Sequence, residues 1–395
     1  MIKQFLKILW NNRRRNILVF VELFMISLVL TNLTIYLVNM YEIYRIKTCY
    51  DTSDVILIQI RKKSSEEKSI TENSFKNLKK VISSNPFVES VSFCNNATPY
   101  MYNSWMDQMD HDSVKIGIGT RFTDIDYGKV MKIQPVKGRW FDETDFGKEV
   151  RPILISKDID EEYFKGNSIG ARAKIRDKEY EIIGVTERYK RSDIETPEKF
   201  AFFLKDSISS KRYWGDVNIL IRTKENMTSE MLNVAQSQVY STINKDNWTI
   251  EGLNSLENMH ASQNAESYQR NYLTVIIAIF IIVNILLGTV GILWYNTNLR
   301  YHEIGIRRAI GATGKKIRQH LIGESILLAI TGLLIVILIV AQLPVIFGSG
   351  KTEPGIIAKS LIISTILMLI LVFLSTWIPA SLASKINPAT ALKTE

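Results

Sequence analysis

Hydrophobic residues in this chain gather in four long blocks, and the segments between the blocks are polar. The blocks cover residues 16–38, 272–295, 325–347 and 360–378. A run of about 18 or more apolar residues with few charges is long enough to cross a bilayer as a helix. The second block contains no charged residue and would reach roughly 36 Å as a helix, whereas helices in soluble cores rarely stay apolar on every face for so long. The pattern therefore predicts four membrane-spanning helices.

The long polar segment 39–271 has the pattern of a folded domain. Near its start, 53–61 alternates like a strand, 66–84 has apolar residues at helical spacing, and 88–93 is again strand-like; near its end, 216–222, 229–243 and 248–252 repeat this order. Two such strand–helix–strand units predict a small α+β lobe that is built from both ends of the domain.

The middle of the domain, at about 100–210, has a different pattern of short strands and turns. Lys174 to Val185 is typical of a hairpin that turns at Arg176-Asp177-Lys178. We therefore expect a β-rich lobe inserted into the first lobe. Residues 255–270 are polar but compatible with a helix, and they run directly into the second apolar block, which predicts one long helix that serves as a stalk.

Lys and Arg residues in the short connecting segments indicate the orientation of the spans. Lys3, Lys7, Arg13, Arg14 and Arg15 precede the first span, and Arg300, Arg307, Arg308, Lys315, Lys316 and Arg318 lie between the second and third, whereas the turn before the fourth contains only Lys351. Short loops rich in Lys and Arg stay in the cytoplasm, and long translocated domains do not count in this rule. Both chain ends and 296–320 are therefore expected in the cytoplasm, and 39–271 outside it.

The predicted fold class is an α-helical membrane protein with four transmembrane helices plus an α+β extracytoplasmic domain of two lobes, a β-α-β lobe with an inserted β-rich lobe. The predicted segments are a cytoplasmic amphipathic N-terminus (1–15), the first span (16–38), the exported domain with its stalk (39–271), the second span (272–295), a cytoplasmic loop (296–320), the third span (321–347), an extracytoplasmic turn (348–359), the fourth span (360–378) and a cytoplasmic tail (379–395). The expected location is the inner membrane of a bacterium.

The N-terminus and the two cysteines leave alternatives to weigh. Residues 2–10 fit a short amphipathic helix at the cytoplasmic surface. A cleaved signal peptide is the competing interpretation of the first block, but no small-x-small site follows it, so an uncleaved anchor is expected.

Cys49 and Cys94 both fall in the exported domain, where an oxidising compartment permits a disulfide. Two separate thiols are an equally open alternative.

Motifs of catalytic or nucleotide-binding proteins are weak in this chain. Residues 347–352 (FGSGKT) end like a phosphate-binding loop, but position 345 is Val where that motif needs Gly, and the turn lies on the side without ATP. His111 stands beside Asp107, Asp110 and Asp112, yet the four His residues of the chain give no ligand pair at helical spacing. We therefore expect neither a metal nor a cofactor in this chain, no enzymatic activity of its own, and no nucleic-acid partner.

Three polar residues fall within or at the edge of the predicted spans: Glu22, Asn284 and Glu324. Such residues are costly in a bilayer and are often functional. No chain of ionisable groups crosses the membrane, which favours a structural role over a proton relay. We expect the two glutamates to approach the interface or to pair with the Arg cluster, and Asn284 to form a hydrogen bond with a neighbouring helix.

The loop between the second and third spans carries the most specific motif. From Arg300 it reads RYHEIGIRRAIGAT, and QHLIGES follows from Gln319. A short helix along the membrane surface would present Ile304, Ile306 and Ile310 as an apolar stripe that suits a groove on a soluble partner. The candidate contact residues are Arg300, Glu303, Ile304, Gly305, Ile306, Arg307, Arg308, Ala309, Ile310, Gly311 and Ala312. The surrounding Arg and Lys residues suit acidic partner residues or anionic lipid.

This loop closely resembles that of the MacB/FtsX-like permeases of ABC transporters, with its R-x-x-EIGIRRAIGA run and its Q-x-L-x-x-ES continuation. The tail from Pro379 to Lys393 resembles the family's ending, and 138–141 (GRWF) with Asp145, 169–170 (IG) and 183–185 (IGV) resemble landmarks of its periplasmic domain. The resemblance covers nearly the whole chain.

The resemblance implies that the 300–313 loop is a coupling helix seated on a separate ATPase. MacB carries its own nucleotide-binding domain before the first span, and only 15 residues precede that span here, so we expect a MacB/LolD-type ATPase subunit that binds the ATP. The family further implies a second permease chain, identical or paralogous, and mechanical transmission to the exported domain rather than a hydrophilic tunnel. A periplasmic adaptor is a further partner of some members. The alternatives are an FtsX-like regulator of a cell-wall hydrolase or signalling partner, and a membrane-anchored sensor or adhesion domain; the substrate stays open.

Overall fold

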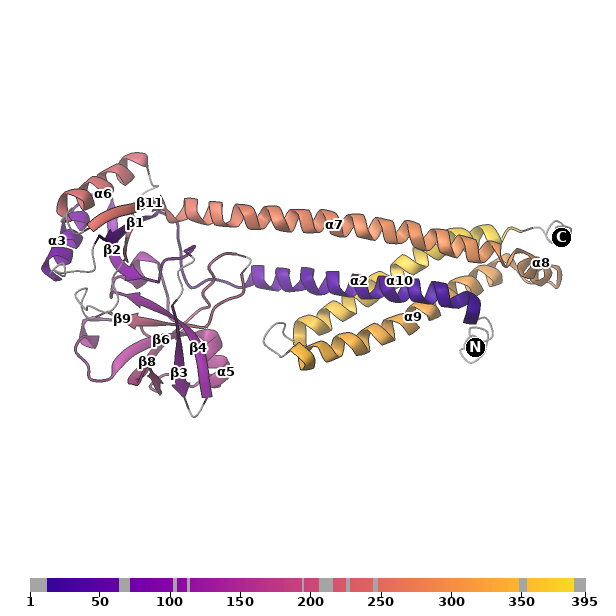
Figure 1. Ribbon diagram of the computed structural model, residues 1–395, viewed down its shortest axis with the longest axis horizontal. Coiled ribbons are helices and arrows are strands. Elements are labelled where there is room, and N and C mark those ends of the chain that lie inside the picture. Colours follow the sequence, from indigo (N-terminus) through magenta and orange to yellow (C-terminus); the bar gives the residue numbers. More distant parts are fainter. Residues whose placement is uncertain are drawn as a thin grey trace. The chain divides into compact units, whose positions relative to one another are not determined.

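The computed structural model describes residues 13–63, 72–101, 105–111, 114–193, 195–205, 216–224, 228–243, 248–347 and 354–386. The chain divides into two compact units, a helical unit (Met1–Glu42 with Arg270–Glu395) and a sheet-rich unit (Ile43–Gln269). Figure 1 shows the elements of both. The amphipathic segment 2–10, most of the 347–352 motif and the tail beyond residue 386 lie outside the described residues.

Four long helices make up most of the helical unit. They are α2 (Arg13–Arg45), α7 (Leu256–Asn298), α9 (Gly314–Phe347) and α10 (Pro354–Ala383). Each contains one of the four predicted apolar blocks, and each is long and apolar enough to cross a membrane by length and composition. The predicted stalk and the second block form one unbroken helix, α7, which starts in the sheet-rich unit. The predicted membrane-protein class is confirmed.

The core of the helical unit is formed mainly by α2, α9 and α10, with Leu293 from α7. Its buried side chains include Leu23 and Leu30 of α2, Ala329 of α9, and Met368 and Val372 of α10. In the most apolar 18-residue stretch of α7 only 11% of the residues are buried, whereas in the corresponding stretch of α9 the buried share is 44%. In a single chain α7 therefore leaves most of its surface open.

One lobe of the sheet-rich unit is formed by the two ends of its sequence. In chain order its elements are β1 (Val55–Lys62), α3 (Glu72–Ser83), β2 (Val88–Asn95), β10 (Asp216–Thr223), α6 (Ser229–Thr242) and β11 (Trp248–Ser255). The strands lie in the order β11-β1-β10-β2 and pair antiparallel throughout. Alternate residues such as Ile58 and Ile219 face α3 and α6, because side chains alternate between the faces of a strand. Both predicted strand–helix–strand units are confirmed.

The inserted lobe is a closed barrel, which the sequence pattern did not predict. Its strands are β3 (Trp105–His111), β4 (Val114–Thr123), β6 (Arg151–Ser156), β7 (Arg172–Ile175), β8 (Lys178–Thr186) and β9 (Phe200–Leu204), with the short β5 (Lys137–Gly138) paired to β8. The ring runs β4-β3-β7-β8-β6-β9, and a parallel pairing of β9 with β4 closes it. The predicted hairpin is β7–β8. Short helical segments α4 (Tyr127–Val130), η1 (Glu143–Asp145) and α5 (Lys157–Tyr163) connect the strands.

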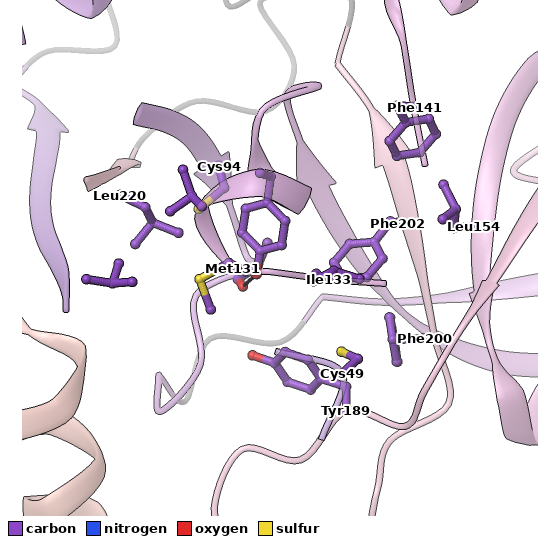
Figure 2. Packing of buried hydrophobic residues seen from close by; sticks show 14 of the residues in the cluster. Cys49, Cys94, Met131, Ile133, Phe141, Leu154, Tyr189, Phe200, Phe202 and Leu220 are labelled. Atoms are coloured by element: carbon purple, nitrogen blue, oxygen red, sulfur yellow. Dashed lines mark hydrogen bonds between the residues drawn. The ribbon is translucent and has the colours of Figure 1, made fainter. Parts of the chain in front are cut away.

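A hydrophobic cluster joins the barrel to the four-stranded lobe (Figure 2). It combines Phe200 and Phe202 of the barrel with Leu220 of β10. Cys94 and Cys49 lie in the same cluster as two buried, free thiols, and Figure 2 shows Cys94 near Leu220 but Cys49 near Tyr189. The disulfide alternative is therefore not realised. Burial raises the pKa of the Cys94 thiol to about 12, which makes it an unreactive core residue.

Candidate functional site

The conspicuous loop motif folds as a short helix, α8 (Tyr301–Ala309), which follows α7 after Leu299 and Arg300. Gly311 ends it in the left-handed conformation with a φ of 100°. The Ala312 N–H donates to the Arg307 carbonyl at 3.0 Å, and the Gly311 N–H donates to the Arg308 carbonyl at 3.1 Å. This pair of bonds is the Schellman cap, in which glycine tolerates the positive φ. The helix predicted for this segment is thus present, with a sharp end.

The inner face of α8 is buried against α9 and α10. Ile304 is only 4% exposed and packs with Ile317 and Leu321 of α9 and with Ala380 and Ala383 of α10. The prediction that Ile304 belongs to an exposed apolar stripe is therefore wrong. At about 100° per residue, positions 304 and 306 point to nearly opposite sides of a helix. Gly305 is also buried.

The outer face of α8 exposes apolar and small residues. Ile310 is 82% exposed, and Ile306, one turn earlier, is exposed as well. Ala309 is exposed between them. Arg307 lies on the same outer side and pairs with Glu303 at 2.5 Å in an i, i+4 arrangement. The surface available to a partner is therefore Ile306, Ala309 and Ile310 with a charged margin; we call these three residues the α8 outer face.

Two of the candidate arginines hold α8 in place instead of facing outward. Arg308 donates to the backbone carbonyl of Ser384 beyond α10. Arg300 forms two hydrogen bonds with the buried carboxylate of Glu324 of α9, one of them at 2.8 Å, and its own side chain is only 11% exposed. Removal of one partner of such a pair leaves a buried charge uncompensated. Arg300 and Arg308 therefore fix the helix on the helical unit, and of the three candidate arginines Arg307 is the one that is exposed.

The three polar residues of the predicted spans have different environments. Glu324 pairs with Arg300, as predicted. Glu22 lies beside Gly288 of α7, and its Oε2 is buried without a hydrogen-bond partner among the described residues. Asn284 donates to the carbonyl of Phe280 in its own helix at 2.8 Å and is exposed. The prediction that Asn284 bonds to a neighbouring helix is wrong for the single chain, because α7 has an open surface on that side.

A second polar cluster, which the sequence analysis missed, holds the first turns of α7. Oδ2 of Asp193, in the loop between β8 and β9, lies 3.0 Å from each of His260 Nε2, Asn264 Nδ2 and Tyr268 Oη. The Asp193 N–H donates in turn to Asn264 Oδ1 at 3.2 Å. The three residues stand at i, i+4 and i+8 and so share one face of α7. We call Asp193 with these three residues the Asp193 cluster. The regular spacing of the three was visible in the sequence, but their partner was not.

The same loop also holds the end of α2. Lys190 Nζ donates to the carbonyls of Ile43 and Asp193, both at 3.0 Å. Tyr50, just after α2, donates from its hydroxyl to the Lys190 carbonyl. Burial lowers the pKa of Lys190, but its two carbonyl acceptors satisfy the ammonium group. The β8–β9 loop therefore contacts the start of α7 and the end of α2, and its own strands belong to the barrel.

The landmarks of the exported domain meet at one structural junction. Gly138 has a φ of 70° and pairs with Gly184 across β5–β8. A Cβ on Gly138 would collide with the Ile183 carbonyl, and a Cβ on Gly184 with the Arg139 carbonyl. Arg139 forms two hydrogen bonds to buried Asp145, at 2.6 and 2.7 Å. These landmark residues therefore serve the fold of the barrel.

The ionisation of Asp145 reflects this junction. Burial alone would raise the pKa of its carboxyl, but the hydrogen bonds from Arg139, from Lys148 at 2.7 Å and from the Asp142 N–H hold that pKa well below its usual range.

Among the described residues no group of three or more His, Cys, Asp or Glu side chains could hold a metal ion. His111 instead stacks on Phe164 with ring centroids 4.2 Å apart, and Asp107 pairs with Arg176.

Comparison with known proteins agrees with this geometry. Residues 26–235 match the family model described as MacB-like periplasmic core domain, and 275–388 match the model FtsX-like permease C-terminal. The ABC transporter permease YknZ of Bacillus subtilis (strain 168) is 24% identical over 340 residues, which is 83% of this chain and 80% of YknZ. The macrolide export ATP-binding/permease protein MacB of Chlorobium luteolum is 24% identical over 287 residues. That alignment covers 68% of this chain but only 42% of the MacB protein.

Solved structures include a similar domain. The extracellular domain of the ABC-type transporter YknZ from Gram-positive bacteria has 18% sequence identity and a TM-score of 0.35. The match covers 50% of this chain and all of that domain.

Proposed function

Since this chain belongs to the family of ABC transporter permeases of the MacB and FtsX type, with a MacB-like periplasmic core domain, we propose that it couples ATP hydrolysis by a separate MacB/LolD-type ATPase subunit to motion of its extracytoplasmic unit. The ATP is bound by that partner, and the chain itself carries no catalytic residues. The motion acts on a substrate at the outer surface of the membrane or within it, so the output is mechanical.

The observation that carries this proposal is that α8 is buried on one side and exposed on the other. One side is fixed to α9 and α10 by Ile304, Arg308 and the Arg300–Glu324 pair, while the α8 outer face stays exposed. An apolar face on a short amphipathic helix fits a groove on a soluble protein. A helix that is bound on its outer side and anchored on its inner side passes a displacement to the bundle, and this supports its role as a coupling helix.

The distribution of Lys and Arg residues supports an orientation of the helical unit in the membrane. Lys and Arg residues before α2 and between α7 and α9 favour the cytoplasm for both chain ends and for α8, in the inner membrane of a bacterium. Lys315 and Lys316 are exposed at the start of α9, where they suit anionic lipid or acidic residues of the ATPase. ATP in the cytoplasm is then on the side where α8 is accessible.

Transmission across the membrane is the proposed task of α7. The helix ends just before α8 and begins in the sheet-rich unit, where the Asp193 cluster ties its first turns to the β8–β9 loop. An unbroken helix is stiff along its axis, because every internal peptide group is hydrogen-bonded to the next turn. A movement of α8 is therefore expected to reach the barrel through α7 and Asp193.

A second permease chain fits the open side of α7. Asn284 exposes its amide in the middle of an apolar helix, and exposed Gly291 follows on the same side with nothing within 4 Å of the place of a Cβ. Polar and small residues are enriched where transmembrane helices associate, since the amide finds a partner and the backbones approach closely. We propose that this side of α7 faces a second copy or a paralogous permease, with lipid around the rest.

The proposal is tested by co-purification in mild detergent with the ATPase encoded nearest to the gene. The test variant is Ile306→Glu with Ile310→Glu, and the matched control is Ile306→Leu with Ile310→Leu, which keeps the outer face apolar. We expect the wild type and the control to retain the ATPase and the Glu variant to lose at least 90% of it. At a subsaturating ATPase concentration this loss corresponds to a binding free energy weaker by roughly 1.4 kcal/mol. Both side chains are exposed, so unfolding temperatures should match. Equal recovery with all three proteins contradicts a coupling role for α8.

A further inference from the structure

A cation–π pair joins the start of α9 to the last third of α10. The guanidinium carbon of Arg318 lies 4.8 Å from the ring centroid of Trp377. Trp377 packs in turn on Phe373, one turn away in α10, with ring centroids 5.4 Å apart. The face of a Trp ring attracts a guanidinium group, so the contact restricts a side chain that is otherwise long and flexible. Arg318 is therefore held at a defined place on the helical unit.

The guanidinium group of Arg318 keeps its hydrogen-bond donors for a ligand. A cation–π contact uses the face of the group, whereas its five N–H donors lie in the guanidinium plane. Among the described residues Arg318 forms neither a hydrogen bond nor an ion pair. Arg318 is half-buried and Trp377 is 43% exposed, so both can be reached from outside. Arg300 and Arg308, by contrast, are used within the chain.

Two lysines add to the positive charge around Arg318. Lys315 is exposed one turn before Arg318 and lies about 60° from it around α9, so both can contact one ligand. Lys316 is exposed as well, but it lies about 160° away from Arg318 around the helix. Before Glu324, α9 contains no acidic residue. The side of α9 that carries Lys315 and Arg318 therefore suits a ligand of negative charge.

From Trp377 toward the middle of α10, one side of the helix is apolar and exposed. Ile366, Ile370 and Phe373 are exposed and lie within about 40° of Trp377 around the helix. We call these three residues with Trp377 the α10 stripe. At 1.5 Å per residue the stripe is roughly 16 Å long, which is about half of the 30 Å hydrocarbon core and therefore one leaflet. A Trp residue at its end is typical of the membrane–water interface.

These features favour a phospholipid over a soluble partner. A phospholipid places its phosphate at the interface and its acyl chains in the hydrocarbon core, which matches Arg318 at one end and the α10 stripe at the other. A guanidinium fork binds two phosphate oxygens at once. A soluble acidic protein can contact Arg318 and Lys315, but it does not enter the bilayer to cover the stripe. The ammonium group of a zwitterionic headgroup would meet Lys315, which favours a lipid of net negative charge.

We propose that Arg318, Lys315 and the α10 stripe form a binding site for one anionic phospholipid, with its phosphate on the two basic residues and an acyl chain along the stripe. In the orientation proposed above, this lipid belongs to the cytoplasmic leaflet. The bound lipid bridges α9 and α10, the two helices against which α8 packs. The site requires that these helices lie in a membrane, but it requires neither the ATPase nor the coupling role of α8.

The test uses the full-length chain in mild detergent, without ATPase or nucleotide. Native mass spectrometry counts bound lipids while dioleoyl phosphatidylglycerol is added, and dioleoyl phosphatidylcholine and water-soluble glycerol phosphate are titrated in parallel. The test variant is Arg318→Gln. The matched control is Lys316→Gln, which removes one charge from the same helix but on another side. Trp377→Leu is a second test variant, because it removes the ring that holds Arg318 and keeps the stripe apolar.

We expect the wild type and Lys316→Gln to bind one phosphatidylglycerol about fivefold more tightly than phosphatidylcholine. Arg318→Gln and Trp377→Leu should lose most of this preference. A fivefold change corresponds to about 1 kcal/mol, which is the contribution of one basic residue near an anionic surface. Unfolding temperatures identify a variant that fails to fold, and the other test variant then decides.

Equal affinity of the wild type for the two lipids overturns the inference. An equal loss of preference in Lys316→Gln and Arg318→Gln also overturns it, because the charge would then act without a defined site. Binding of glycerol phosphate as tightly as the lipid would indicate a site for free phosphate. If no lipid preference exists and Arg318→Gln fails to recover the ATPase in the co-purification test, this surface belongs to the ATPase. The test of α8 stands apart from these results, since Ile306 and Ile310 lie outside the lipid site.

Discussion

The Asp193 carboxylate and the Tyr268 hydroxyl lie 3.0 Å apart, although one belongs to the β8–β9 loop and the other to the fourth turn of α7. Asn264 and His260 reach the same carboxylate oxygen from the turns before. One acidic side chain thus holds three successive turns of the helix that continues into the membrane. Its removal should loosen α7 from the barrel without any change in the core of either.

We predict that Asp193→Ala uncouples the extracytoplasmic unit from ATP hydrolysis. Three hydrogen bonds of about 1 kcal/mol each are lost, so the unfolding temperature should fall by roughly 5 °C or more. Hydrogen exchange of residues 256–268 should accelerate, while α8 and ATPase recovery stay unchanged. Asp177→Ala, an exposed acid in the β7–β8 turn, is the control. Wild-type exchange in the Asp193→Ala variant would exclude the cluster as the link between helix and barrel.

A second prediction concerns pH and the Arg139–Asp145 pair. The pKa of Asp145 is lower in the folded protein than in the unfolded chain, so its stabilisation is complete above about pH 4 and is lost as the pH falls through the folded pKa. Asp145→Asn should cost about 2 kcal/mol at pH 7, because Arg139 is partly exposed and water screens part of the loss. Thermal unfolding at pH 7, 5, 4 and 3 measures this. The gap between wild type and variant should narrow toward pH 3, and a gap that widens would contradict the pairing.

Gly184→Ala is predicted to damage the fold more than its size suggests. A Cβ at this position collides with the Arg139 carbonyl, which is backbone and cannot swing away. We expect a loss of about 3 kcal/mol or more, as for other overpacked sites. Gly147→Ala is a useful contrast, since the φ of Gly147 is positive at 73° but nothing lies within 4 Å of the added carbon. Urea unfolding of both variants separates the cost of the collision from the cost of the backbone conformation.

The exposed amide of Asn284 gives a prediction about assembly. If this side of α7 faces a second permease chain, Asn284→Cys should form an intermolecular disulfide in membranes treated with a mild oxidant. Ile279→Cys is the control, because it is exposed on the same helix about 140° away. Native Cys49 and Cys94 are buried and should not contribute. Equal crosslinking at positions 279 and 284 would reject this face as the contact.

Local patterns predicted the elements well but not their long-range partners. The four apolar blocks and the two strand–helix–strand units can be predicted because short stretches of sequence show the pattern of apolar and polar residues that each element needs. The alternation around Ile58 and Ile60 is an example. Asp193 gave no signal, because its partners come from an element that is distant along the chain. Closure of the barrel likewise depends on the β4–β9 pairing, which no local pattern encodes.

The candidate site was predicted in its position but not in its orientation. The motif placed α8 correctly, yet the sequence alone did not say which of Ile304 and Ile306 faces the bundle. That choice is made by the fit of Ile304 among Ile317, Leu321 and Ala380. Arg300 and Arg308 were predicted as partner contacts from their charge, whereas the structure uses both within the chain. The roles of the outward residues remain a prediction.

The place of the insert in the sheet has a consequence for biogenesis. β2 and β10 are neighbours in the four-stranded lobe, but the whole barrel separates them along the chain. While the chain is being translocated, β1, α3 and β2 emerge first and must wait with unpaired strand edges until the barrel has followed and β10 and β11 arrive. Unpaired edges attract other chains, and pairings between distant segments form slowly. Nascent molecules of this protein are therefore most vulnerable to aggregation and to proteases after β2 has crossed the membrane and before β10 has crossed it. A folding factor outside the cytoplasm would have its greatest effect during this interval.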